Sequence, residues 1–335
     1  MGSRLCPGPS PFFPAFFPNC FSELFFRTIF PNCPEKGVSP MLARSAPRAN
    51  LKYSTTKRIT YACFVLPALV LYLFTVVFPF FQGIPYSLTN WNLVSSQSEF
   101  VGLKNYVTLM HSTSFWRSIR NTFQFAVYYI VFANLIGLGI ALLIHRPSRL
   151  NNICRTLVFM PYVISMLTAA FVWKYIFNTV YSPLFGVQSP LAIKSQAMLG
   201  IAVISVWRTS GYCMLIYIAA LQGVPNEYYE AASVEGAGKW YQFTRITVPM
   251  IIPAFSVNVS LLLAWGLKVF DAVMATTNGG PGRDTTTTMA MFIYNNIFGN
   301  SKAGYGQAAA VIMTVILLTL SFLVSKFFRS KEVDA

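Results

Sequence analysis

Six stretches of mostly apolar residues, separated by polar segments, dominate the chain. Each is close to the roughly 20 apolar residues that a helix needs to cross a bilayer. The pattern predicts membrane-spanning helices over residues 59–81, 122–144, 156–177, 197–221, 248–270 and 308–325. The second span is the clearest, because no charged residue lies between Thr122 and Ile144. We therefore expect an all-α integral membrane protein with six transmembrane helices.

Prolines interrupt two of these spans. Pro67 and Pro79 lie in the first, and Pro249 and Pro253 lie in the fifth. Such kinks are tolerated within a bilayer because neighbouring helices or ordered waters satisfy the carbonyl groups that proline leaves free. The prolines therefore predict bent spans and do not argue against them.

The composition agrees with this class of protein. Apolar residues make up 55% of the chain, charged residues make up 10%, and the mean hydropathy is +0.53. These values lie far from average soluble usage. A net charge of +15 could suggest binding to nucleic acid, but the basic residues lie mainly at the ends of the spans. Nucleic acid is therefore not an expected partner.

The lysines and arginines also predict the orientation, because short cytoplasmic segments carry an excess of them. Four groups flank the spans: Arg44, Arg48, Lys52, Lys57 and Arg58; Arg146, Arg149 and Arg155; Lys239 and Arg245; and Lys326, Arg329 and Lys331. All four face the cytoplasm if both termini do. We expect a multi-pass membrane protein with a transmembrane domain over 59–328 and cytoplasmic tails at 1–58 and 329–335.

Residues 1–40 differ from the rest of the chain. They hold eight of the 20 prolines and eight of the 30 phenylalanines, which prevents a continuous helix. The spacing of Cys6, Cys20 and Cys33 matches no usual zinc pattern. We expect this segment to be disordered or not native, with Met41 as the true start.

A polar segment at 225–249 separates the fourth and fifth spans. Pro225 suits a first helical turn, where its missing N–H would lack a partner in any case. Glu227 and Glu230 then fall early in the helix, where the helix dipole favours negative charge. The segment therefore predicts a short helix that begins near Pro225.

A turn and a second helix follow. Ala231 and Ala232 are small and allow another surface to approach closely. Gly236 and Gly238 permit a sharp turn, including a positive φ. The second helix is expected over 240–245, and its aromatic residues would supply apolar docking area. The simpler alternative is an ordinary amphipathic connecting loop.

The spacing within this segment resembles the EAA loop of permease subunits in binding-protein-dependent ABC importers. The matching residues are Glu230, Ala231, Ala232, Gly236, Ile246 and Pro249. The family usually has leucine where Val248 stands and often has aspartate where Glu235 stands, and both departures are conservative. The resemblance implies a MetI-like fold in the bacterial plasma (inner) membrane, with a cytoplasmic loop that docks onto an ATPase.

Other segments are similar to the same family, in matching order from about residue 59 to 328. They include 100–106, 155–162 and 277–282, and together they resemble carbohydrate importers of the maltose and multiple-sugar type. The resemblance implies a heterodimer with a second permease subunit, two ATP-binding subunits, an extracytoplasmic solute-binding protein and a sugar substrate. ATP and Mg would be used by the ATPase, so this chain would bind no cofactor and would not be an enzyme.

Arg208 is the one charged residue near the middle of a predicted span, and charges at that depth are functional candidates. Together, Trp207, Arg208, Thr209 and Tyr212 offer aromatic faces and hydrogen-bonding groups, which suit a sugar. The family resemblance implies that this stretch contributes to the translocation site. The alternative is that Arg208 bonds a carbonyl or carboxylate between packed helices.

The next span departs from the family pattern. Leu262, Gly266 and Val269 stand where the family has polar site positions. Lys268 and Asp271 lie three residues apart, on what the pattern predicts to be one helix face. A local ion pair is the favoured interpretation of these two charges, and contact with substrate is the alternative.

Other classes of protein fit less well. An ion-coupled secondary transporter would place acidic residues at membrane depth, but none of the ten lies in the middle of a predicted span. No filter-like sequence suggests a channel. Gly238 and Lys239 are followed by Trp240, so no phosphate-binding loop is expected, and isolated histidines give no metal site. Among importers, a permease for glycerol-phosphate or another small polar solute is the alternative.

Overall fold

The computed structural model describes residues 61, 63–93, 98–282 and 284–329. The chain divides into two units, Met1–Leu66 and Pro67–Ala335, and in the first unit the structure describes residues 61 and 63–66. The described part is helical, and its only bridge is an isolated antiparallel pair, Thr89 and Phe100. The expected tails lie outside the described residues apart from Arg329, as do the N-terminal cysteines and the expected start.

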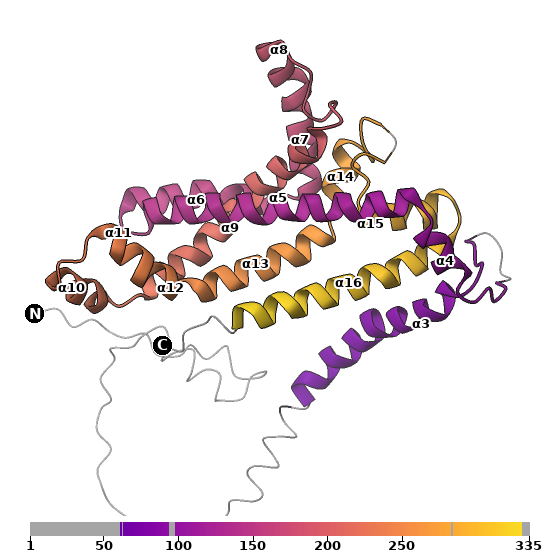
Figure 1. Ribbon diagram of the computed structural model, residues 1–335, viewed down its shortest axis with the longest axis horizontal. Coiled ribbons are helices and arrows are strands. Elements are labelled where there is room, and N and C mark those ends of the chain that lie inside the picture. Colours follow the sequence, from indigo (N-terminus) through magenta and orange to yellow (C-terminus); the bar gives the residue numbers. More distant parts are fainter. Residues whose placement is uncertain (1–60, 62, 94–97, 283, 330–335) are drawn as a thin grey trace, which may run out of the picture. The chain divides into compact units, whose positions relative to one another are not determined.

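The second unit holds the helices that are labelled in Figure 1. The main ones are α3 (Phe78–Ser87), α5 (Thr113–Ile144), α6 (Arg149–Val163), α9 (Ala197–Gly223), α13 (Ile252–Leu267) and α16 (Ala303–Arg329). Shorter helices are α4 (Lys104–Met110), α7 (Met166–Tyr175), α8 (Ser182–Phe185), α10 (Asn226–Val234), α11 (Lys239–Gln242), α12 (Val248–Met250), α14 (Asp271–Thr276) and α15 (Met289–Tyr294). Segments of π-helix are η1 (Leu73–Val77), η2 (Ile176–Tyr181), η3 (Phe243–Thr247) and η4 (Asn295–Gly299).

The described helices agree with six apolar spans when bent pairs are counted as single spans. Four helices are long and apolar enough to cross a membrane alone: Cys63–Ser87, Thr113–Ile144, Ala197–Gly223 and Ala303–Phe328. Two bent pairs add one span each: Arg149–Val163 with Met166–Phe185, and Lys239–Met250 with Ile252–Leu267. The all-α membrane fold predicted from the sequence is thereby confirmed.

The third span is not continuous, and the prediction of one helix over 156–177 is wrong in this respect. Helix α6 ends at Val163, and α7 leaves it at 97°. Ile164 and Ser165 both have extended backbone, and the Ser165 hydroxyl accepts a hydrogen bond from the amide of Thr168 at 3.2 Å. The break therefore has its own N-cap, which begins α7 in a new direction.

The fifth span bends where its prolines predicted a kink. The helix of α11, η3 and α12 meets α13 at 57°, and Ile251 lies at the bend between Pro249 and Pro253. Helix α13 ends at Leu267, three residues before the expected end of the span at 270. The earlier end places the residues after Leu267 in a loop.

The second span begins earlier than its apolar pattern suggests, at Thr113 and not at Thr122. Ser112 precedes the helix, and its hydroxyl accepts from the amide of Phe115 at 3.3 Å. The ring of Phe115 packs edge-on against Phe292 of α15, with 5.9 Å between centroids. An N-cap and a tertiary contact therefore extend the helix through residues that are less apolar.

The centre of the bundle is formed where α5 packs along α9 (Figure 1), with α6 on α9 and α13 on α5. Small residues let the backbones approach, as is usual between membrane helices. A Cβ added at Gly137 would lie 2.7 Å from that of Cys213. Polar pairs join the same helices. The Tyr217 hydroxyl donates to Oδ1 of Asn134 at 2.5 Å, and both residues are buried.

We expect Tyr217→Phe to lower the stability of the solubilised protein by about 1 kcal/mol, because the buried Asn134 amide oxygen loses its donor. Tyr175→Phe is the matched control, since Tyr175 is 64% exposed. Thermal unfolding in detergent, followed by loss of monodisperse protein, measures both variants. Equal midpoints for the two would contradict a stabilising role for the Tyr217–Asn134 bond.

Candidate translocation pathway and coupling loop

Arg208 lies on α9 and contacts the break between α6 and α7. Its Nε donates to the carbonyl of Ile164 at 2.8 Å, and its guanidinium carbon is 5.2 Å from the centre of the Tyr162 ring. Ile164 has left the helical conformation, so its carbonyl needs a donor from elsewhere. Arg208 therefore has the carbonyl contact that one of the two sequence interpretations expected.

Arg208 also lines a cavity of about 280 Å³ (the α9 cavity). The other lining residues are Phe125, Tyr129, Met166, Ser205, Thr209, Trp265, Lys268, Val269, Phe270, Asp271 and Ala272. They come from α5, α7, α9, α13, the loop that follows α13 and the first two residues of α14. Arg208 can bond the Ile164 carbonyl and still donate into the cavity, because a guanidinium has five N–H donors.

Three aromatic rings from three helices gather next to this cavity. Tyr212 of α9 stacks on Tyr162 of α6 with 4.9 Å between centroids, and Trp265 of α13 is 5.5 Å from Tyr212. Trp265 and Tyr162 are 6.4 Å apart. Aromatic faces of this kind can pack against the C–H surface of a sugar. Tyr212 is thus brought close to Arg208 through Tyr162.

The other two pathway candidates have different surroundings. Trp207 packs edge-on against Trp173 at 5.6 Å and lines a separate apolar hollow, so the structure does not bring it to the α9 cavity. Thr209 is buried, its hydroxyl donates to the carbonyl of Ser205 at 2.8 Å, and it lies 2.9 Å from the Tyr129 hydroxyl. Thr209 therefore joins α9 to α5 in the wall of the α9 cavity.

The predicted ion pair between Lys268 and Asp271 is wrong. The two side chains form no salt bridge, although both line the α9 cavity. Helix α13 ends at Leu267, Lys268 is its C-cap, and Asp271 begins α14, so the two do not share one helix face. Both charges are consequently available to the cavity, together with Arg208.

Two of the three positions that depart from the family pattern, Leu262 and Gly266, are used for packing. Leu262 is 1% exposed, and a Cβ at Gly266 would lie 3.3 Å from the Cα of Ala126, where α13 crosses α5. Val269 alone of the three lines the α9 cavity. The charged groups of this cavity are supplied by Arg208 of α9 and by Lys268 and Asp271, which follow α13.

The coupling loop, residues 225–249, forms a helix–turn–helix. Helix α10 ends at a Schellman motif, in which the amide of Ala237 donates to the carbonyl of Ala232 at 2.9 Å and that of Gly236 donates to Ser233 at 3.1 Å. Gly236 has φ +79°, as the turn requires, whereas Gly238 has φ −68°. The predicted turn is present, and Gly236 is the residue with the left-handed backbone.

The two helices of the loop differ slightly from the prediction. Pro225 is the residue before α10 and is not in its first turn. The second helix does not stop at Arg245, because α11, η3 and α12 continue from Lys239 to Met250. Ile246 and Pro249 therefore lie on one continuous helix, which is the first arm of the bent fifth span.

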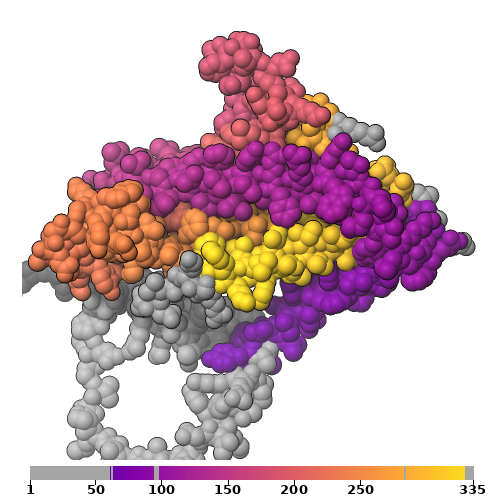
Figure 2. All heavy atoms as spheres, in the orientation of Figure 1, coloured from indigo at the N-terminus to yellow at the C-terminus, as the bar shows by residue number. Residues whose placement is uncertain are grey.

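The loop exposes an apolar surface at one end of the second unit, where α10 and α11 form an orange lobe in Figure 2. Val234 is 89% exposed, Trp240 is 77% exposed and Tyr241 is 57% exposed. Glu230 and Ala231 are also exposed, whereas Ala232 is half-buried. Neighbouring exposed apolar side chains of this kind commonly mark a surface that contacts another protein or lipid.

Within the described residues, no three of His, Cys, Asp and Glu gather as metal ligands. Cys63, Cys154 and Cys213 are free thiols.

Comparison with known proteins identifies the family. Residues 133–331 match the family described as "Binding-protein-dependent transport system inner membrane component". This match covers more than half of the chain. The chain belongs to this family. It is the membrane-embedded permease component of an ABC importer and is not itself an enzyme.

Individual relatives of this permease agree along most of its length. It is 35% identical over 282 residues to the probable starch degradation products transport system permease protein AmyD of Thermoanaerobacterium thermosulfurigenes, covering 82% of this chain and 96% of the relative. It is 32% identical over 280 residues to the multiple sugar-binding transport system permease protein MsmF of Streptococcus mutans, covering 81% and 95%.

Among solved structures, a chain of a bacterial ABC transporter involved in the import of the acidic polysaccharide alginate has the same fold. The TM-score is 0.72 at 21% identity, and the match covers 84% of this permease and 98% of that chain.

The sequence did not single out two aromatic residues of the candidate pathway, Tyr162 and Trp265. Both lie in apolar spans, where an aromatic residue is commonly part of the core. Their proximity to Tyr212 depends on how α6 and α13 pack against α9, which the sequence pattern does not contain. The sequence held one indication of this site, because Tyr162 lies in one of the segments that resemble the family.

Proposed function

We propose that this permease imports a saccharide, specifically an oligosaccharide, across the plasma membrane with energy from ATP hydrolysis on a separate subunit. The observation that carries the proposal is the exposed coupling loop, whose Schellman turn presents Trp240 and Val234 to a partner. The relatives named for starch degradation products and multiple sugars support the substrate class. Both termini are on the cytoplasmic side, as is the coupling loop.

The proposed partners follow from an importer of this kind. A second permease subunit completes the pathway, two ATP-binding subunits use ATP and Mg, and an extracytoplasmic solute-binding protein delivers the sugar. The coupling loop docks onto one ATP-binding subunit through Glu230, Ala231 and Ala232 on α10, with Gly236 at the turn. Ile246 and Pro249 lie on the first arm of the bent fifth span, which transmits the motion of the loop to α13.

In the proposed pathway, sugar enters the α9 cavity. Arg208 donates hydrogen bonds to hydroxyl groups, and the Tyr212–Trp265 pair packs against apolar sugar faces. Thr209 positions the wall through Tyr129. Trp207 stabilises the neighbouring face and does not contact sugar. Alternating access then arises when nucleotide-driven closure of the ATPase rotates this bundle against its partner.

The function can be tested by affinity purification of the tagged chain from gently solubilised membranes. We expect a second permease and an ATP-binding subunit to co-purify. In proteoliposomes, the binding protein with maltotriose should stimulate ATP hydrolysis, whereas glycerol 3-phosphate should not. Stimulation by glycerol 3-phosphate alone would contradict the saccharide assignment, and uptake by the isolated chain driven by an ion gradient would contradict the importer mechanism.

Arg208→Lys separates the two roles of this residue. Lysine can still donate to the Ile164 carbonyl but lacks the planar fork of guanidinium. We expect thermal stability within a few degrees of wild type and a half-saturating sugar concentration raised about tenfold, which corresponds to about 1.4 kcal/mol. Arg208→Met should lower both stability and uptake. A normal half-saturating concentration in Arg208→Lys would mean that Arg208 only holds the break.

A further inference from the structure

A second cavity, the asparagine pocket, lies at the end of the second unit away from the coupling loop (Figure 1). The segment after α3, helix α4, η4 and the first turn of α16 form most of its wall. Its volume is about 940 Å³, near the upper end of the roughly 300–1,000 Å³ of small-molecule sites. It shares no lining residue with the α9 cavity.

The chemistry of this lining suits a neutral ligand with many hydroxyl groups. Six asparagines contribute to it: Asn90, Asn92, Asn105, Asn295, Asn296 and Asn300. A carboxamide both donates and accepts, which matches a sugar hydroxyl. The charged lining residues cancel in formal charge, since Lys104 and Lys302 oppose Glu99 and Asp284. A strongly anionic ligand such as a nucleotide is therefore not favoured.

One wall of the pocket is held in place by hydrogen bonds. The Asn105 side-chain amide donates to the carbonyls of Ser87 at 2.9 Å and Thr89 at 2.8 Å. The amide of Gly304 donates to the carbonyl of Trp91 at 2.9 Å, and a Cβ at Gly304 would collide with the Thr89 carbonyl. The wall is thus preorganised, which lowers the entropic cost of binding a ligand.

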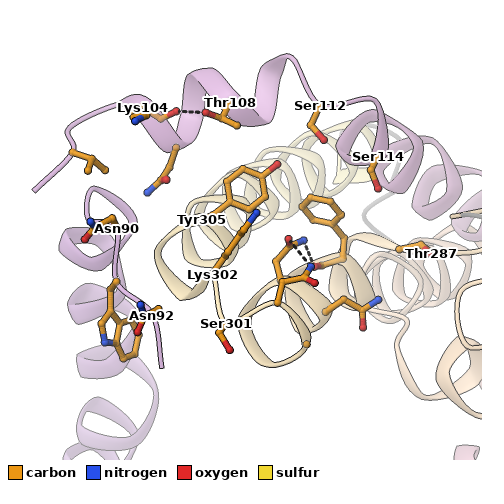
Figure 3. Close-up of a pocket in the computed structure, with 18 of the residues that line it drawn as sticks. Asn90, Asn92, Lys104, Thr108, Ser112, Ser114, Thr287, Ser301, Lys302 and Tyr305 are labelled. Carbon is orange, nitrogen blue, oxygen red and sulfur yellow. Dashed lines mark hydrogen bonds between the residues drawn. The ribbon is translucent and has the colours of Figure 1, made fainter. Parts of the chain in front are cut away.

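Other polar groups remain available to a ligand. Lys302 and Tyr305 extend from the start of α16 into the middle of the pocket (Figure 3). The side-chain polar atoms of Asn295, Lys302 and Tyr305 form no hydrogen bond or salt bridge with other described residues. The Tyr305 ring also supplies an aromatic surface at which sugar C–H groups can pack. Donors, an acceptor and an aromatic surface therefore occur in one pocket.

We propose that the asparagine pocket is a second saccharide-binding site, separate from the α9 cavity and on the extracytoplasmic side. This inference rests on the proposed import of a saccharide. The pocket holds sugar before it reaches the α9 cavity, and Asn295, Lys302 and Tyr305 make the contacts. Its occupant is the saccharide itself and not a segment of the binding protein.

Hydrogen–deuterium exchange of the purified permease complex, without binding protein, gives a local test. Maltotriose is added at about ten times its dissociation constant. Some amides within 299–306 exchange only when this segment opens locally, and the open segment cannot bind sugar. Exchange of these amides should become about tenfold slower. The effect should vanish in Asn295→Ala/Lys302→Ala. It should persist in Asn178→Ala/Lys194→Ala, which changes two exposed residues of the same types away from the pocket lining.

The outcomes separate this inference from the proposed function. Absence of protection in wild type, or protection that persists in Asn295→Ala/Lys302→Ala, overturns the second site. Loss of binding-protein docking in that variant, with sugar protection unchanged, also overturns it by making the pocket a protein contact. Uptake of maltotriose by wild type is measured separately, and its absence would count against the proposed function whatever the exchange experiment shows.

Discussion

Gly236→Asp should reduce sugar-stimulated ATP hydrolysis and uptake at least about tenfold, a change of about 1.4 kcal/mol or more, while the protein still reaches the membrane. Gly236 has φ +79°, a conformation that costs other residues energy but that aspartate tolerates comparatively well. A Cβ there meets no atom within 4 Å in this chain. The added carboxylate would therefore act at the proposed ATPase interface, where an unpaired buried charge is costly.

Gly236→Asn is the control for this prediction. Asparagine has nearly the shape of aspartate and tolerates the same backbone, but it carries no charge. We expect it to retain more coupling than Gly236→Asp, with equal amounts of both proteins in the membrane. Hydrolysis at the wild-type rate in purified Gly236→Asp complexes would exclude this turn from the docking surface.

Gly211→Ala should be strongly destabilising, because it adds a methyl group where α9 packs closely against α6. The new Cβ would collide with the carbonyl oxygen of Val158 and lie 2.8 Å from the Cα of Phe159. Both are backbone atoms, so no rotamer change can make room, and α6 must move away from α9. We expect a loss of about 1–3 kcal/mol, as for other overpacked sites, and lower uptake because Arg208 and Tyr212 flank Gly211.

Gly139→Ala provides the comparison. Gly139 is also inside a long helix, α5, but a Cβ there meets no atom within 4 Å. Alanine favours the helix by up to about 1 kcal/mol over glycine, so its melting midpoint should stay the same or rise. If the two alanine variants melt at the same temperature in detergent, close packing of α6 on α9 at Gly211 is not what stabilises this region.

Local sequence patterns predicted much of this fold. The apolar runs identified the spans because a helix needs enough apolar residues to cross a bilayer. Pro249 and Pro253 predicted the bend of the fifth span. The break in the third span was missed because hydropathy does not change there. The only local indication of the break is the cap formed by Ser165 and Thr168. This short pattern also occurs at ordinary helix starts, so it does not by itself predict a break.

The site was predicted less evenly. Gly236 was identified because a tight turn has a local requirement for glycine. The pathway depends on tertiary packing: Trp207 faces away from the α9 cavity although it adjoins Arg208, and Trp265 enters from another helix. The prediction of a Lys268–Asp271 ion pair was wrong because residues three apart lie close together only within a continuous helix, and α13 ends at Leu267.

The proposed function requires that an ATPase drives this permease through its coupling loop. Reconstitution of the co-purified complex into proteoliposomes, with ATP inside and the binding protein with maltotriose outside, tests it most directly. We predict sugar accumulation that requires both ATP and binding protein and that is lost in Gly236→Asp. Accumulation that needs neither, and that instead follows an imposed proton or sodium gradient, would contradict the account.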